Sequence, residues 1–177
     1  VLAGEYRSSR RRRPWAGLSL VYADHDNGGD YAEAIRRAAG TGSAPDLTSS
    51  HRNGTLKDGF GFNMEQQITK DVGIFGRLGW NDGKTESFAF TAVDRLATAG
   101  VSSTGRRWHR PLDSLATEFT SGGISDVHAQ YLARGGYDFL IGDGRLRYGR
   151  ESIWESYYSA RLFPGFFASF DLQHVSN

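Results

Sequence analysis

Cysteine is absent from this chain of 177 residues, and methionine occurs only once. The absence of cysteine excludes a disulfide scaffold, a thiolate zinc site and a cysteine nucleophile. Proline is scarce, with 4 residues, and the only lysines are Lys57, Lys70 and Lys84. Lys and Arg number 21 against 20 Asp and Glu, so the net charge of +1 gives no overall field that would favour nucleic acid.

Long hydrophobic runs are also missing. The longest uninterrupted apolar run, residues 20–23, is far shorter than the roughly 20 residues that a membrane-spanning helix needs. Residues 1–5 lack the charged and then apolar profile of a signal peptide. The sequence therefore predicts no transmembrane helix. It leaves open a soluble protein, or a segment of a protein whose targeting signal lies elsewhere.

Glycine, with 23 residues, and aromatic residues, at 13 %, are abundant instead, and apolar residues alternate with polar ones. In residues 58–69, Phe60 and Phe62 fall on one face while Asn63 and Glu65 fall on the other, a period of two that is typical of strands. Residues 81–84, with Asp-Gly at the centre, predict a hairpin turn. The pattern predicts strands at 15–24, 58–69, 72–81, 85–93, 96–103, 114–122, 137–142, 151–162 and 166–176.

Two segments interrupt the alternation and predict short helices. Residues 30–39 begin with Asp30, a suitable N-cap, and residues 125–134 begin with Ser125 or Asp126 and end before two glycines. Residues 40–57 are a loop by composition, and residues 104–113 form a charged loop.

Alternation fits two kinds of all-β protein. A soluble sandwich buries its apolar faces between two sheets, whereas a membrane barrel turns them toward lipid and keeps a polar lumen. Strands of about 9–11 residues have the length of a tilted membrane-crossing strand. Small and charged residues share the polar face, and aromatic residues such as Trp15, Trp80 and Trp154 lie near strand ends, as in the girdles of a barrel.

Several segments carry a more specific pattern: GWNDGKTESFAFT at 79–91 followed by Asp94-Arg95, RWHRPLD at 107–113, GISDVH at 123–128, YLA at 131–133, IGDGRL at 141–146, Tyr148-Gly149 and ESYYS at 155–159. In this order they resemble the carbohydrate-selective porin family of Gram-negative outer membranes. The resemblance is good over residues 59–177 and loose over 15–37. The chain departs from the family at Ala92, Ser121 and Arg150, where an acidic residue, asparagine and proline are usual.

The resemblance implies an all-β fold, an antiparallel transmembrane β-barrel of sixteen strands with short helical loop insertions in the bacterial outer membrane. Such a barrel passes carbohydrates by passive diffusion. It implies no enzyme activity and no cofactor; its partners are small sugars, outer-membrane lipid and lipopolysaccharide. About nine strands are predicted here, so we expect residues 1–177 to be one partial barrel domain, truncated at both ends. Both a monomer and a homo-oligomer stay open.

The polar face of such a barrel lines the channel. The residues expected to line it are Glu65, Arg77, Glu86, Glu118, Glu155, Tyr157, Arg161 and Asp171. One interpretation is that these side chains hydrogen-bond sugar hydroxyls, with Phe75 and Tyr157 offering flat faces to pyranose rings. The other is that they are ordinary lumen residues in a cross-barrel ion network.

Other clusters give weaker signals. Residues 10–13 are four arginines that read as a solvated turn, and residues 106–110 are a basic cluster that fits a loop at the channel mouth, a site for lipopolysaccharide phosphates, or a loop folded on the barrel. Residues 24–30 resemble a calcium loop, but Ile35 stands where the bidentate carboxylate is needed. No hydrolase, phosphate-loop or metalloprotease motif occurs, so no catalytic or metal residue is expected.

A β-sandwich that binds glycans without transporting them, either soluble or at the cell surface, is the alternative. The two proteins differ in one simple property. A sandwich buries its apolar faces and needs no detergent to stay in solution, whereas a barrel exposes its apolar faces and does.

Overall fold

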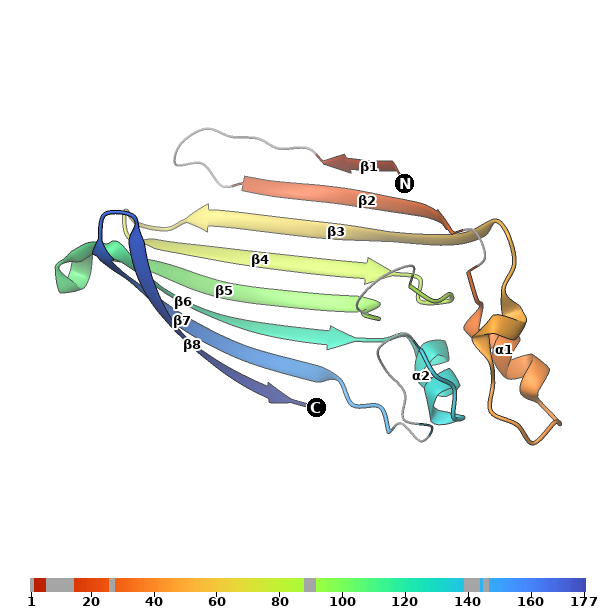
Figure 1. The fold of residues 1–177 in the computed structure, drawn as a ribbon. Coiled ribbons are helices and arrows are strands. Elements are labelled where there is room, and N and C mark those ends of the chain that lie inside the picture. Colours follow the sequence, from red (N-terminus) through yellow and green to blue (C-terminus); the bar gives the residue numbers. More distant parts are fainter. Residues whose placement is uncertain (1, 6–14, 26–27, 88–91, 139–143, 145–146) are drawn as a thin grey trace.

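Eight strands pair side by side in one curved antiparallel sheet, in the order β1 to β8 along the chain (Figure 1). The computed structural model describes residues 2–5, 15–25, 28–87, 92–138, 144 and 147–177. The elements are β1 (Leu2–Glu5), β2 (Trp15–His25), α1 (Tyr31–Ala38), a 3-10 helix (Leu47–Ser50), β3 (Thr55–Gln67), β4 (Val72–Asn81), β5 (Arg95–Gly105), a second 3-10 helix (Arg106–Trp108), β6 (Arg110–Gly123), α2 (Asp126–Ala133), β7 (Glu151–Phe163) and β8 (Phe166–Ser176).

The two ends of the sheet differ. At one end the strands are joined by tight turns, at 68–71, 106–109 and 164–165. The last of these is the turn predicted there, and Gly165 takes a φ of 82°, which suits glycine. At the other end, long connections carry α1 and α2, which lie next to each other (Figure 1). We call these the short-turn end and the long-loop end.

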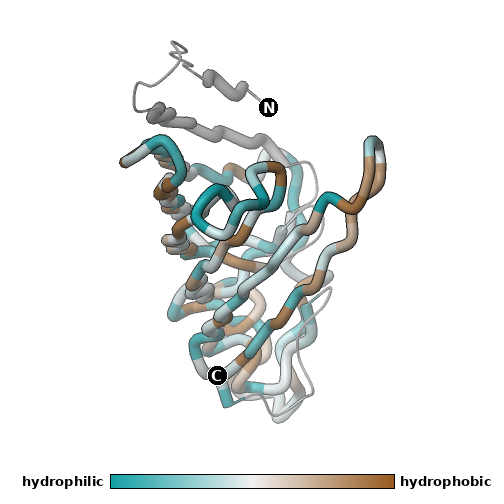
Figure 2. Tube along the Cα trace, turned by 90° about the vertical axis from the view of Figure 1, so that its left-hand side faces the viewer, coloured by the Kyte–Doolittle hydropathy of each residue, from teal (hydrophilic) through white to brown (hydrophobic). Residues whose placement is uncertain are grey.

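The strand register separates the side chains of β3 to β8 into two faces. Cross-strand partners share a face, and Figure 2 shows hydrophilic and hydrophobic residues alternating along the strands. The polar face carries Asn63, Glu65, Arg77, Thr98, Ser102, Glu118, Thr120, Glu155, Tyr157, Ser159, Arg161, Asp171 and Gln173. The apolar face carries Phe60, Ile74, Leu78, Trp80, Val101, Leu115, Phe119, Trp154, Phe170 and Leu172.

The apolar face is uncovered. Its ten large apolar side chains just named are between 37 % and 71 % exposed. In a water-soluble protein, a contiguous apolar surface over several strands is normally covered by a second layer. In the part of the chain that the structure describes, no such layer lies on this sheet (Figure 1).

The hydrophobic core lies instead at the long-loop end. It is formed by side chains of α1, of α2 and of the first 3-10 helix, and by the residue that follows β6. Its members are Tyr31, Ala34, Leu47, Ile124, Tyr131 and Leu132. The helices begin as predicted, because Asp30 accepts a hydrogen bond from the Glu33 N–H and Ser125 from the His128 N–H. Neither helix is long and apolar enough to cross a membrane, for the residues that the structure covers.

The predicted hairpin at 81–84 and the predicted strand at 85–93 are wrong for the described residues. β4 ends at Asn81 and β5 begins only at Arg95. The Gly83 N–H does donate to Asn81 Oδ1 (2.9 Å), but the chain then leaves the sheet and Thr85 pairs with Asp30 in an isolated bridge. Residues 88–91 lie outside the described part.

The described residues form eight strands, where the sequence predicts about nine for the whole chain. The predicted strand at 137–142 falls mostly outside the described residues, and its first two residues are not in a strand. The short β1 was not predicted. The predicted loops at 40–57 and 104–113 each contain a 3-10 helix and the start of a strand. The four arginines at 10–13 lie outside the described residues.

Candidate functional site on the polar face of the sheet

The polar face is hollowed, which makes it the concave side of the sheet. A hollow of about 610 Å³ opens over β3 to β7, and its walls include Glu65, Phe75, Ser102, Ala116 and Tyr157. A smaller recess of about 30 Å³ lies between Phe75, Glu118, Glu155 and Tyr157. Both hollows bring together residues from strands that are distant in sequence.

Seven of the eight predicted lining residues lie on this face. The register aligns Glu65 with Phe75, Phe75 with Gly100 and Gly100 with Glu118. The same row continues from Glu118 to Glu155 and on to Gln173. Arg77, Tyr157, Arg161 and Asp171 share the face in neighbouring rows.

Glu86 is the exception, because the strand that would place it on the face does not form. It lies in the long connection between β4 and β5, where Oε1 accepts from the Gly29 N–H (2.7 Å) and lies 2.9 Å from His51 Nε2. Glu86 therefore fastens one long connection to another.

Phe75 lies flat across the sheet because its neighbour on β5 has no side chain. A Cβ at Gly100 would lie 2.2 Å from the Phe75 ring carbon Cζ. The absence of that atom lets the ring rest on the backbone and present its outer face to the concave side. A flat apolar ring beside carboxylates is a surface that suits a sugar, with its apolar ring face and its hydroxyls.

The carboxylates of the face are accessible for hydrogen bonding. Glu118 stands directly opposite Glu155, whose carboxylate accepts from Gln173 Nε2. Arg77 donates to Asn63 Oδ1 (2.8 Å) rather than to a carboxylate. Among the described residues, none of the ion pairs joins two of the predicted lining charges.

A second polar cluster, at the long-loop end, is buried. His128 is 1 % exposed and lies between two carboxylates: Nδ1 is 3.3 Å from Asp94 Oδ2, and Nε2 is 2.9 Å from Asp138 Oδ2. The His128 ring stacks on Tyr31 with centroids 4.2 Å apart, and the Tyr31 hydroxyl donates to Asp138 (2.6 Å). Asp94 also accepts from the Ser125 N–H (2.7 Å).

The contacts of this buried cluster determine its charges. Burial alone lowers the pKa of His128, but the hydrogen bonds to Asp138 and Asp94 outweigh it and raise that pKa above 6.5. Burial raises the pKa of Asp94, but the bonds from His128 and the Ser125 N–H outweigh it and lower that pKa. Burial and the nearby Asp138 raise the pKa of Tyr31, so its hydroxyl stays a donor.

These shifts predict how the stability of the long loops depends on pH. The His128 contribution is complete below the unfolded pKa of 6.5 and is lost as pH rises through the raised folded value. The Asp94 contribution is complete above 3.8 and is lost as pH falls through the lowered folded value. We therefore expect hydrogen exchange in α2 to be slowest between these limits and to accelerate, after correction for the intrinsic rate, on the alkaline side. A protection factor that is flat from pH 6 to 9 would contradict this.

Sequence reasoning missed most of this cluster. Ser125 was expected as a cap and His128 as a structural residue, but nothing marked Asp94 or Asp138 as its partners. The only available signal was that Asp94 and His128 both fall in segments of the family pattern.

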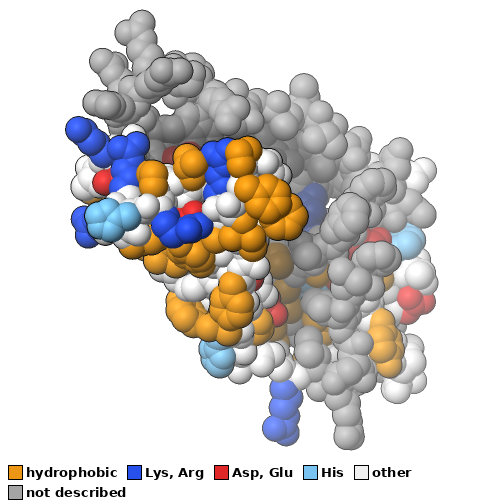
Figure 3. All heavy atoms as spheres, turned by 60° about the vertical axis from the view of Figure 1, so that its left-hand side comes forward, with side chains coloured by type: hydrophobic (Ala, Val, Ile, Leu, Met, Phe, Trp, Pro, Cys, Tyr) orange, Lys and Arg blue, Asp and Glu red, His pale blue; other side chains and the backbone are white. Residues whose placement is uncertain are grey.

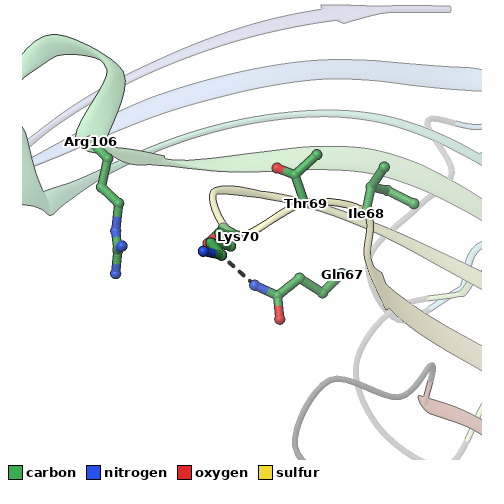
Figure 4. Close-up of a pocket in the computed structure, with 5 residues that line it drawn as sticks. All are labelled: Gln67, Ile68, Thr69, Lys70 and Arg106. Atoms are coloured by element: carbon green, nitrogen blue, oxygen red, sulfur yellow. Dashed lines mark hydrogen bonds between the residues drawn. The ribbon is translucent and has the colours of Figure 1, made fainter.

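The short-turn end carries a third feature, a shallow hollow of about 430 Å³ (Figure 4). It lies beside the β3–β4 turn, and Gln67 and Lys70 of this turn line it together with Arg106 of the neighbouring turn. Gln67 Nε2 donates to the Lys70 carbonyl (3.3 Å), and Arg106 Nε lies 3.2 Å from Asp71. The predicted basic cluster at 106–110 therefore lies at the end opposite to the long loops.

Comparison with known proteins gives one family and one fold. The model of the family described as carbohydrate-selective porin, OprB family, matches residues 16–177. A solved structure of OprB from Pseudomonas putida at high pH is similar, with a TM-score of 0.71 and 17 % identity, over 92 % of this chain and 39 % of that one. No curated protein matches this chain. The chain thus spans about two fifths of the length of that structure.

Proposed function

Because the chain belongs to the carbohydrate-selective porin family, we propose that its sheet is part of the wall of an outer-membrane barrel through which sugars diffuse passively. The observation that carries the proposal is the distribution of side chains over the two faces, which is the reverse of that in a soluble sandwich. The concave face holds the charged and polar residues, and the other face exposes large apolar side chains such as Phe119 and Trp154. That arrangement suits a polar lumen surrounded by lipid.

Closure of the barrel follows from the chemistry of lipid. An open sheet edge would leave backbone N–H and C=O groups without partners in the hydrocarbon region. Among the strands that the structure describes, β8 pairs with β7 alone, and all of its residues are exposed. We propose that further strands pair along this edge and along β1 to complete the ring.

The orientation is proposed from the two kinds of connection. Bacterial outer-membrane barrels place short turns on the periplasmic side and longer loops outside the cell. The turns at 68–71 and 164–165 would then face the periplasm, and the cluster around His128 would lie outside.

The lining supplies the selectivity. Glu118 and Glu155 accept hydrogen bonds from sugar hydroxyls, Arg77 donates to them, and Phe75 and Tyr157 pack against the apolar faces of the ring. Passage needs no cofactor, because diffusion follows the gradient. Each contact is weak enough for the sugar to leave as well as to enter.

The test is liposome swelling with the full-length gene product. We expect faster swelling in glucose than in charged or amino-acid solutes of similar size. A Glu118→Gln/Glu155→Gln variant should lose part of that preference, whereas Ser121→Ala, on the apolar face, should keep it. Equal rates for all solutes would contradict sugar selectivity. No swelling by a protein that stays soluble without detergent would contradict the channel and favour the glycan-binding sandwich.

A Gly100→Ala substitution probes the lining without changing its charge. Alanine is normally favoured over glycine within a strand by roughly 0.5–1 kcal/mol, so the sheet should remain folded. The new Cβ would displace the Phe75 ring, since they cannot occupy the same space. We expect glucose flux to change by about twofold or more, because the ring moves into the lumen. Gly79→Ala, whose Cβ would lie 3.5 Å from its neighbour, is the control; equal flux in both variants would contradict the role of Phe75.

A further inference from the structure

An aspartate is buried on the apolar side of the sheet, near the short-turn end. Asp113 is 3 % exposed, and the β6 register places it on the same face as Leu115 and Phe119. Its carboxylate is bound by the Arg110 guanidinium, by the Tyr158 hydroxyl and by the Arg161 N–H (3.0 Å). A buried carboxylate is tolerated only when its hydrogen bonds are satisfied, as they are here.

The consequence of this arrangement is a fixed guanidinium. Arg110 contacts Asp113 through Nε and Nη2, and Nη2 also donates to the Arg161 carbonyl (2.9 Å). The side chain nevertheless stays 47 % exposed, so part of its hydrogen-bonding fork faces outward. Beside it, Trp108 Nε1 donates to the Tyr158 hydroxyl (3.1 Å). Trp and Tyr are enriched at the headgroup level of membranes, and Arg is well suited to binding phosphate there.

The surroundings are cationic and partly apolar. Arg107 precedes Trp108 in the same 3-10 helix and is exposed. Arg106 is paired with Asp71 (3.2 Å), and Lys70 lines the hollow of the polar face, so Arg107 is the cation that this site adds to Arg110. Figure 3 shows Lys and Arg side chains gathered beside hydrophobic ones at this end. The rings of Phe163 and Phe166, on either side of the β7–β8 turn, stack with their centroids 4.8 Å apart, and at least half of each residue is exposed.

We propose that the Trp108–Arg110 segment, held by Asp113 and Tyr158, binds the phosphate headgroup of an anionic phospholipid in the leaflet at the short-turn end. A guanidinium recognises phosphate oxygens by two parallel hydrogen bonds, and Arg107 adds charge. The position favours a phospholipid over lipopolysaccharide, because the cluster lies opposite to the long loops. The inference rests on the proposed function, since it requires the apolar face to meet lipid.

The test measures lipid binding to the full-length product from mixed micelles by native mass spectrometry. We expect phosphatidylglycerol to be retained about tenfold better than phosphatidylcholine, and Arg107→Gln to weaken that binding about fivefold. The double substitution Arg110→Met/Asp113→Leu should also weaken phosphatidylglycerol binding about fivefold. It removes both partners of the ion pair, so no buried carboxylate is left without its guanidinium. Arg36→Gln/Arg37→Gln, at the long-loop end, is the control and should bind as the wild type does.

Glucose swelling of liposomes, measured on the same preparations, separates the two proposals. Equal binding of the two phospholipids by a protein that still conducts glucose would overturn the lipid site and leave the porin intact. Retention that is unchanged in both substituted proteins would overturn it as well. Full competition by millimolar inorganic phosphate, or a preference for lipid A over phosphatidylglycerol, would reassign the segment to a simple anion site or to lipopolysaccharide.

Discussion

A His128→Leu variant is expected to lose about 3–5 kcal/mol of stability in the assembly of long loops. The substitution removes the imidazole that bridges Asp94 and Asp138. Asp94 keeps Lys57 Nζ at 3.8 Å, but both carboxylates then face an apolar side chain where the ring had been. Replacing both partners of a buried ion pair by apolar residues often costs little stability. Removing only one partner costs far more, because the remaining charge stays buried without a counter-charge. Hydrogen exchange in α1 and α2, together with limited proteolysis of the long connections, would measure the loss.

The control for this prediction is His174→Leu. His174 is exposed on β8 and pairs with Trp154 on the apolar face, so its replacement removes no buried charge. Loops that remain as protected in His128→Leu as in His174→Leu would contradict the account of the buried cluster.

A Phe119→Arg variant is expected to destabilise the membrane-inserted protein by about 2–4 kcal/mol. Phe119 lies well inside β6, on the apolar face, and is 52 % exposed. In the proposed orientation that exposed surface is hydrocarbon, where a guanidinium cannot be hydrated. Reversible urea unfolding of the full-length product in phospholipid vesicles would give the free energy.

The adjacent residue provides the matched comparison. Glu118→Arg places the same side chain one position away, on the polar face, where water and the facing Glu155 can accommodate it. We expect this variant to change the free energy of unfolding little and to alter solute preference instead. The reverse order of the two costs would show that the faces have been assigned the wrong way round.

The sequence predicted the sheet where neighbouring residues alone determine the structure. Residues 72–81 and 166–176 form strands because their apolar and polar side chains alternate, which places each kind on its own face of the sheet. The turn between β7 and β8 forms where Gly165 allows a positive φ. The polar lining follows from the same parity, which is why Glu65, Glu118 and Glu155 share one face.

Prediction failed where distant contacts decide the conformation. The Asp-Gly pair at 82–83 has the sequence of a hairpin, and Gly83 does take a positive φ of 59°. However, the Gly83 carbonyl accepts a hydrogen bond from Ser125 Oγ (2.6 Å), and Asp94 is held by His128. Partners more than 30 residues away thus draw the segment into the long-loop assembly. Glu86 moves with it and leaves the lining.

These 177 residues contain no cysteine, so a thiol introduced here is the only one in this segment, and any cysteine elsewhere in the full-length product would first be replaced by serine. Successive residues of β6, from 114 to 120, would be replaced by cysteine one at a time in the full-length product, reconstituted in liposomes and exposed to a charged, water-soluble maleimide. We expect labelling at 114, 116, 118 and 120, on the polar face that the proposal turns to the lumen, and protection at 115, 117 and 119, on the face that it turns to lipid. Uniform labelling, or labelling of the odd positions alone, would contradict a sheet with a wet concave face and a lipid-covered apolar one.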